Sequence, residues 1–538
     1  MEKNLYSPTM LKSFLNCKYI IVNESFQKKW NIKKKEKSIS DKIRLSEGDK
    51  HELAYLKDLK KKFKVLELKK KDLSREDKIK KTIDGMSKGV DIIHGGYLKS
   101  GQWVGEFDFL VRKEGLKSKF GKYGYEVIDT KNSSKTKPDH IIQIGMYTYQ
   151  LENLQRILPE KMHIVLKDKK KESFKINEVY EFFKSTKATY EKFLSNGFKK
   201  AYPDKCSFCE ICDWQDVCKD KWVKDDHLNQ VAGLNKIHIK KFKEAGIKTM
   251  TQLAQKKENS SIKDFRPESS KKLISQAKLQ FEFLKNKKMN FKFLEENKNK
   301  LKGFNLLPKS SNCDLFFDME SVADYVYPGG LEYLFGIYYE ENGKQNFKTF
   351  WAHNRGEEKK SLVKFFEFTD KHFKKYPDAK IYHYASYEVN ALSRLTSLHK
   401  VKNIEYDHYL HLEKFVDLFK VVRQGIQISE DSYSLKNIEK FYNFKRTGEV
   451  VKAEESEDVY VEWTLSKQQK LLDQIENYNR QDCHSTFELR QWLLSIRPEY
   501  SSWYVPSKEE MELREHEIKF IEYDKKINKS KIQTNLKK

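Results

Sequence analysis

Two neighbouring stretches carry acids and a lysine in a pattern suited to phosphodiester chemistry. Residues 125–131 are apolar and β-branched and predict a strand, on which Asp129 and Lys131 share one face. An acid and a lysine at a strand end can hold a divalent cation and a phosphate side by side. Residues 104–111 predict a preceding strand, with Asp108 facing away from its phenylalanines. Two strands that each present an acid suit metal-assisted hydrolysis; a hairpin with a solvated polar face is the alternative.

A second group of acids lies in the C-terminal half. Residues 315–321 predict a strand on which Asp318 and Glu320 share a face. Two adjacent carboxylates repel each other unless a cation lies between them, so we expect a metal. Tyr478 and Asp482 share a face of a predicted helix that runs through residue 494. Alone they would be ordinary helix surface, but beside Asp318 and Glu320 they complete a constellation.

Cysteines are concentrated in one short segment. Four occur within thirteen residues: Cys206, Cys209, Cys212 and Cys218. Buried structural cysteines have no reason to cluster in this way, so the spacing indicates a metal or iron–sulfur site. Thiolates suit zinc and iron–sulfur clusters equally well, and their chemistry does not choose between the two. A lone cysteine such as Cys17 is usually a small core residue.

Composition indicates several domains and a polyanionic partner. The chain has 538 residues, and its 105 basic against 79 acidic residues give a net charge of +26. This balance favours nucleic acid as a partner, although a lysine-rich proteome would give the same bias. No apolar run reaches the length of a membrane span, and the N-terminus lacks the apolar region of a signal peptide. We therefore expect a cytoplasmic protein without disulfides.

Glycine turns follow the cysteines. Gly233 and Gly246 lie among apolar residues at helical spacing, which predicts a helix-hairpin-helix unit. Its glycine turn would let backbone amides approach a phosphate independently of base sequence; a helical linker is the alternative. We expect a nuclease-like domain at 1–222, this DNA-binding linker at 223–302, a second α/β domain at 303–497, and a basic, partly disordered tail at 498–538.

The N-terminal region resembles the RecB-like nucleases of the PD-(D/E)XK superfamily. The matching residues follow the family's order of motifs: His51, Asp108, Asp129, Lys131, Gln143 and Tyr147. The resemblance implies that the histidine and the two acids bind Mg²⁺ or Mn²⁺, and that the lysine activates water. The helix that carries Gln143 and Tyr147 would support the site and touch DNA.

Several members of this superfamily bind a [4Fe–4S] cluster through one cysteine before the nuclease core and three after it. Cys17 with Cys209, Cys212 and Cys218 resembles that set, which leaves Cys206 over. One departure is Lys18, where relatives often have proline. The fifth cysteine keeps other ligand sets open, including a local four-cysteine zinc site.

The C-terminal half resembles the DnaQ-like (DEDD) exonucleases of the RNase H fold. Its matching motif residues are Asp318, Glu320, Tyr478 and Asp482. The middle motif, usually Asn-x₃-Phe-Asp, reads His383-x₃-Tyr387-Glu388, so Glu388 stands for the usual aspartate. The resemblance implies catalysis by two metal ions, with Tyr478 orienting the attacking water. The longer arm of Glu388 puts the activity of this half in question.

Both halves in this order resemble the RecB-family nucleases that carry a YprB-like RNase H domain, over residues 7–497. We thus expect an α/β multidomain chain with a restriction-endonuclease-like domain, a helix-hairpin-helix linker and an RNase H-like domain. The expected function is metal-dependent hydrolysis of DNA ends or single strands, as in DNA repair. Alternatives are a nucleic-acid-binding protein in which only the N-terminal site cuts, and an RNA-directed exonuclease. No G-x₄-G-K-[ST] motif occurs, so a helicase would be a separate partner.

Overall fold

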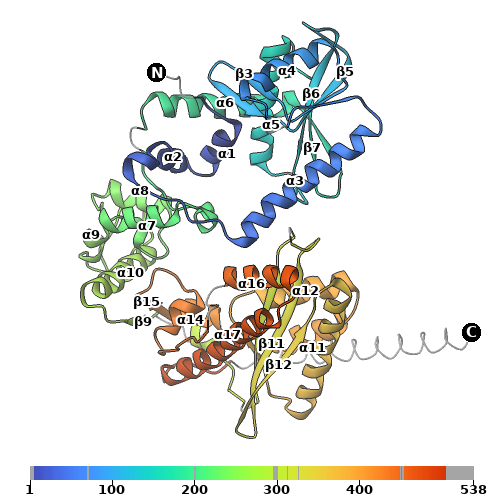
Figure 1. Ribbon diagram of the computed structural model, residues 1–538. Coiled ribbons are helices and arrows are strands. Elements are labelled where there is room, and N and C mark those ends of the chain that lie inside the picture. The colour runs from blue at the N-terminus through green and yellow to red at the C-terminus, as the bar shows by residue number, and fades with distance from the viewer. Residues whose placement is uncertain are drawn as a thin grey trace, which may run out of the picture. The chain divides into compact units, whose positions relative to one another are not determined.

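A computed structural model describes residues 5–69, 72–198, 201–294, 301–311, 313–324, 326–448, 450 and 453–504. Most of the expected tail, 505–538, lies outside these residues. The chain divides into two compact units, residues 1–222 and 223–538 (Figure 1). Among the helices of the described residues, none is long and apolar enough to cross a membrane.

The first unit contains a mixed sheet, a small hairpin and surrounding helices. Its elements are α1 (Pro8–Asn16), α2 (Lys18–Trp30), α3 (Ile39–Lys60), β1 (Val65–Glu67), α4 (Arg75–Ser87), β2 (Ile92–His94), β3 (Tyr97–Ser100), β4 (Trp103–Glu106), β5 (Phe109–Ser118), β6 (Gly121–Thr130), α5 (Pro138–Gln155), β7 (Lys161–Val165), β8 (Lys171–Lys175), α6 (Ile176–Ser195), the 3₁₀ helix η1 (Ser207–Ile211) and α7 (Gln215–Lys224). Caps fix several helix starts; the hydroxyl of Ser7, for example, accepts a hydrogen bond from the Met10 amide at the start of α1.

The six-stranded sheet has the order β1-β2-β5-β6-β7-β8. β5 and β6 are antiparallel, whereas β6 and β7 are parallel and connected through α5. Side chains that alternate along β6 enter two different cores. Tyr125 and Val127 pack with residues of α5, while Ile128 packs with Leu56 of α3 on the opposite face. Asp129 therefore lies on the α5 face, as the alternation predicts.

The strand predicted over residues 104–111 is interrupted in the structure. It divides into β4 and β5, with Phe107 and Asp108 between them. Phe107 packs in the core under α5, whereas Phe109 packs in the core under α3. The sequence predicted that both rings would share one face, and this prediction is wrong. The expected continuous strand is wrong because β4 pairs with β3 and β5 pairs with β2 and β6. The break leaves Asp108 at the entrance to β5.

The second unit contains helices followed by a five-stranded sheet. Its elements are η2 (Leu228–Gln230), α8 (Lys236–Glu244), α9 (Met250–Ala254), α10 (Pro267–Asn286), β9 (Phe291–Phe293), η3 (Gly303–Leu306), β10 (Leu315–Val322), β11 (Leu331–Glu341), β12 (Lys344–Trp351), α11 (Arg355–Lys375), β13 (Ile381–His383), α12 (Tyr387–His399), α13 (Asn403–His411), β14 (Phe415–Asp417), α14 (Leu418–Gly425), β15 (Ile426–Ile428), α15 (Leu435–Glu439), α16 (Ala453–Ser466) and α17 (Gln469–Ser495).

The large sheet, of which β11 and β12 are labelled in Figure 1, has the order β12-β11-β10-β13-β14. β10, β11 and β12 form an antiparallel meander, and β13 and β14 extend it in parallel with β10. One core contains Phe317 with Leu362 of α11 and Leu392 of α12. The other contains Phe316 with Phe487 of α17. Helices thus cover both faces, and the long helix α17 lies against β10 in the centre of the sheet.

Residues 228–286 form a helical subregion with its own apolar core. Gly233 and Gly246, the expected turn glycines, both have φ = +81°, which favours glycine over other residues. The subregion is attached to the rest of the second unit by polar contacts to β15. The Gln276 side chain donates to Ile428 O (2.8 Å), and Gln427 donates to Lys272 O (2.9 Å).

Candidate active site in the C-terminal unit

Three carboxylates converge between β10 and α17. Asp318, Glu320 and Asp482 each place an oxygen so that all three oxygens lie within 4.8 Å of one another. β10 presents the first two acids from alternate positions, and α17 brings the third across the sheet. Glu320 and Asp482 are buried and Asp318 is half-buried. An all-oxygen donor set of this kind fits Mg²⁺ or Mn²⁺.

The electrostatics of this triad also favour a cation. Burial, together with the negative charges of Asp482 and Glu320, raises the pKa of Asp318 well above its ordinary value. Burial and Asp482 raise the pKa of Glu320 to about 8. Without a cation, these groups must hold protons or repel one another. A divalent ion would relieve both costs, since it stabilises the ionised carboxylates.

Neutral side chains orient two of the acids. Asn479 is fully buried and donates its amide hydrogen to Asp318 Oδ2 (2.7 Å). Ser456 donates its hydroxyl hydrogen to Glu320 Oε2 (3.0 Å). Gly336 of β11 makes room for Asn479, since a Cβ there would meet Asn479 Oδ1 at 1.7 Å. The sequence reasoning missed Asn479, although it follows Tyr478 directly.

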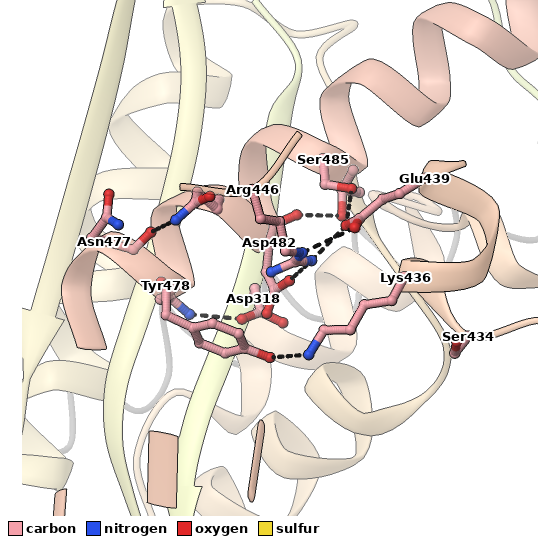
Figure 2. Close-up of polar contacts among 12 residues, drawn as sticks. Asp318, Ser434, Lys436, Glu439, Arg446, Asn477, Tyr478, Asp482 and Ser485 are labelled. Atoms are coloured by element: carbon pink, nitrogen blue, oxygen red, sulfur yellow. Dashed lines mark hydrogen bonds and ion pairs between the residues drawn. The ribbon is translucent and has the colours of Figure 1, made fainter. Parts of the chain in front are cut away.

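An arginine neutralises the third acid. The Arg446 guanidinium forms an ion pair with Asp482 and a two-point contact with Glu439, at 2.5 and 3.0 Å (Figure 2). Ser485 donates to Glu439 (2.7 Å) and so fixes the carboxylate that holds the arginine. Sequence patterns did not indicate Arg446, because it lies in an irregular segment between α15 and α16.

Tyr478 is held between a cation and an anion. Lys436 Nζ donates to the Tyr478 hydroxyl (3.3 Å; Figure 2), and the negative charge of Asp482 acts on the same phenol. Burial and the surrounding carboxylates raise the pKa of Tyr478, so the phenol stays protonated. Burial and Arg446 lower the pKa of Lys436. Lys436 is a second group that the sequence reasoning did not single out.

Glu388 lies near the triad but outside its 4.8 Å group. It occupies the first turn of α12 and is only 4% exposed. Its Oε2 atom has no hydrogen-bond partner among the described residues, and His383 Nδ1 lies 3.6 Å away. The charge of Glu388 contributes to the raised pKa of Asp318. Glu388 is therefore a fourth acid whose charge acts on Asp318, although it lies outside the group formed by the other three.

The acids and the lysine expected in the N-terminal unit also meet. Asp108 Oδ2 accepts from the amide and the hydroxyl of Thr130, both at 2.7 Å. Lys131 Nζ lies 2.5 Å from Asp129 Oδ2. Burial and the charges of Asp129 and Glu52 raise the pKa of Asp108 to about 7. Asp129 is 1% exposed, so the solvated hairpin considered above is excluded.

Helices α3 and α5 complete this N-terminal cluster. His51 Nε2 lies 3.3 Å from Val165 O, at the end of β7. The adjacent Glu52 is buried and is held by His94 (2.8 Å) and Lys69 (2.7 Å). Glu52 is thus an acid of this cluster that the sequence reasoning missed, because on a charged helix it resembles ordinary surface.

Gln143 and Tyr147 lie four residues apart and share a face of α5. Tyr147 is buried, and its pKa is raised by burial and by the charge of Asp129. The helix that was expected to support the site therefore reaches it through this tyrosine.

All five expected cysteines line one small cavity of about 10 Å³. They come from the junction of α1 and α2 and from residues 206–218, and all are free thiols. Cys206 Sγ lies 3.8 Å from Cys209 Sγ. Burial and the neighbouring thiols Cys17 and Cys212 raise the pKa of Cys218 to about 12. The structure therefore brings Cys17 to the others across a long stretch of sequence, and a bound metal would favour their thiolate forms.

The comparisons concern the C-terminal unit. The family model of the RNase_H superfamily matches residues 315–494, from the start of β10 to the end of α17. Among curated proteins, none matches the chain. RNase H-like nucleases use Mg²⁺ or Mn²⁺, and the matched segment contains the carboxylate triad. Residues 315–494 are therefore an RNase H-like domain, and this fold indicates a nuclease-type function on nucleic acid.

Proposed function

We propose that the C-terminal unit is a metal-dependent exonuclease that digests DNA from ends or as single strands. The observation that carries this proposal is the convergence of Asp318, Glu320 and Asp482. Mg²⁺ or Mn²⁺ held there would supply Lewis-acid activation of water and of the phosphate. Asn479 and Ser456 hold two of the carboxylates in place. Tyr478, fixed by Lys436, positions the attacking water.

We further propose that the N-terminal unit is a second nuclease of the RecB-like type. Asp108 and Asp129 would hold the metal, with Glu52 or His51 as the additional ligand from α3. Lys131 would contact the phosphate and activate water, since its ammonium lies beside Asp129. The support is that motif residues far apart in the sequence meet around the ends of β6 and β7: His51 contacts Val165 O, Asp108 accepts from Thr130, and Lys131 pairs with Asp129.

The cysteine cavity supports a proposed [4Fe–4S] cluster, with zinc as the alternative. Cys17, Cys209, Cys212 and Cys218 would be the ligands, and Cys206 lies close enough to replace one of them. Such a cluster would join the start and the end of the nuclease unit. Visible absorbance after anaerobic purification, together with iron and zinc analysis, distinguishes the two metals.

Cleavage assays test both active sites. Wild type, Asp129→Ala, Asp318→Ala and the double variant are incubated with Mg²⁺ or Mn²⁺ and with single-stranded or duplex DNA and RNA, labelled at either end. Two working sites predict that each single variant loses one product pattern and the double variant loses both. Retention of all cleavage by Asp318→Ala would contradict the C-terminal proposal. A preference for RNA would favour an RNA-directed exonuclease instead.

A further inference from the structure

A groove of about 490 Å³ lies beside the RNase H-like domain within the second unit. One wall is the glycine turn at Ala232 and Gly233. The other wall comes from residues far along the chain: Tyr384, Ala385, Phe419, Arg423 and residues 431–435. The groove therefore joins the helical subregion to the catalytic domain, and the site described above does not use it.

The glycine wall is rigid and open. The Ala232 amide donates to Gln280 Oε1 (2.8 Å), which fixes the turn onto α10. Gly233 is exposed, and a Cβ there would meet only Leu273, at 3.9 Å. With φ = +81° and no side chain, this turn presents its backbone directly to the groove. Backbone amides of this kind contact phosphates without reading base sequence.

The opposite wall offers aromatic surfaces. Tyr384 and Phe419 lie edge to face with ring centroids 5.6 Å apart, and both are partly exposed. Tyr384 donates its hydroxyl hydrogen to Tyr433 O (2.6 Å), which holds the ring in place. Arg423 lies over the Tyr433 ring, 4.5 Å from its centroid. Unpaired bases stack on surfaces of this kind, whereas paired bases in a duplex cannot reach them.

Two lysines outside the groove lining, Lys272 of α10 and Lys302, lie near its Arg423. Burial lowers the pKa of Lys272, and the positive charges of Arg423 and Lys302 lower it further. Three neighbouring cations repel one another, so an anionic ligand would stabilise them. The one acid in the groove lining, Asp431, is engaged by the Asn437 side chain (3.4 Å).

Two segments that line the groove continue directly into groups of the active site. Ser434 and Leu435 line it, and the next residue, Lys436, reaches the hydroxyl of Tyr478 (Figure 2). On the same wall, the amide of Ala385 donates to Asp417 (3.0 Å), and Glu388 follows three residues later. The groove wall is thus connected through one residue to Lys436 and through three residues to Glu388.

We infer that this groove binds single-stranded nucleic acid, with phosphates on the Gly233 turn and on Arg423, and directs the strand to the triad. The inference rests on the proposed exonuclease function for the direction of the strand. It adds a substrate path that couples the helical subregion to catalysis, and it requires an unpaired strand.

The test measures binding separately from cleavage. Full-length wild type, Lys272→Glu, Arg423→Gln and the control Lys344→Glu are titrated into fluorescein-labelled oligothymidine or oligouridine in EDTA, and anisotropy is followed at several salt concentrations. Lys344 is exposed and is the first residue of β12, so its reversal matches the charge change of Lys272→Glu at another place. Thermal unfolding shows whether each variant retains the wild-type fold.

We expect Lys272→Glu and Arg423→Gln each to weaken binding about ten-fold and to lower the salt dependence by about one phosphate contact, with Lys344→Glu close to wild type. If folded variants bind as tightly as the control, the groove does not bind the strand and the inference is overturned, even if Asp318→Ala abolishes cleavage. Conversely, loss of binding in the groove variants of a protein that never cleaves would support the groove and refute the exonuclease. Oligothymidine and oligouridine report whether the strand is DNA or RNA.

Discussion

The two acidic clusters of this chain balance their charge in different ways. In the N-terminal unit, Asp129 is paired with Lys131, and Glu52 is paired with Lys69 and His94. In the C-terminal unit, the four acids Asp318, Glu320, Glu388 and Asp482 lie near two cations, Arg446 and Lys436, and Glu439 already engages the arginine. The N-terminal cluster is close to neutral without metal, whereas the C-terminal one keeps excess negative charge. We therefore expect the C-terminal site to depend on its metal for stability as well as for activity.

Asp318→Asn should give the largest effect. Loss of this carboxylate should lower C-terminal cleavage by about 10³-fold or more, because the metal loses a central ligand. The same change should raise the melting temperature in EDTA, since it removes one of several repelling buried acids. End-labelled digestion and thermal unfolding measure the two effects. A variant that loses activity and also becomes less stable would contradict the charge imbalance.

Lys131→Met should abolish the cleavage that remains in an Asp318→Asn background. The ammonium of Lys131 lies beside Asp129, and its loss should cost about 10²-fold or more in rate because phosphate and water lose their partner. Product patterns from labelled DNA measure the loss. Lys135→Met, in the exposed loop that follows, is the control. Unchanged cleavage by Lys131→Met would contradict a nuclease function for the N-terminal unit.

Arg446→Met should destabilise the metal-free protein by about 3 kcal/mol, since it leaves Asp482 and Glu439 buried without their cation. Mg²⁺ should restore part of this loss, because the ion replaces the missing positive charge at Asp482. Melting curves with EDTA and with Mg²⁺ test this. Equal destabilisation in both conditions would mean that Arg446 has only a structural role, independent of the metal.

The metal-free second unit should lose stability as the pH rises. The folded-state pKa of Glu320, about 8, lies above its ordinary value of 4.5. Below pH 4.5 the group is protonated in both states; between 4.5 and 8 the unfolded chain releases the proton first, so unfolding becomes more favourable. The loss should be on the order of a few kcal/mol by pH 8. Mg²⁺ should oppose it, and a flat melting temperature across this range in EDTA would refute the prediction.

Glu388→Asp should have the smallest effect. Glu388 lies outside the 4.8 Å group, so a shorter acid changes the outer part of the site and should alter the C-terminal rate less than about ten-fold. Glu388→Gln, which removes the charge, should cost more, because Glu388 contributes to the field at Asp318. If both variants cleave like wild type, Glu388 is not part of the active site.

Much of the prediction for the C-terminal half followed from the periodicity of its strand and helix. The strand with Asp318 and Glu320 is β10, and the helix with Tyr478 and Asp482 is α17, as expected. Arg446, Lys436 and Asn479 were missed, because an arginine in an irregular segment and a lysine in a short helix have no pattern that distinguishes them from surface residues. The interruption at Phe107–Asp108 was missed for a related reason. Residues 104–111 alternate well enough for one strand, and only pairing with different neighbours divides them.

The sequence by itself determined which residues could do chemistry: acids at alternate positions on strands, a lysine two residues from an acid, and cysteines at metal-binding spacing. Those patterns are local, so propensity and side-chain alternation are sufficient to read them. Only the tertiary structure decided which groups meet, since sheet order and helix packing bring Asp482 to Asp318 and Cys17 to Cys218. It also decided how charge is balanced, because burial and partners such as Arg446 and Glu52 are set by contacts between segments far apart in the chain.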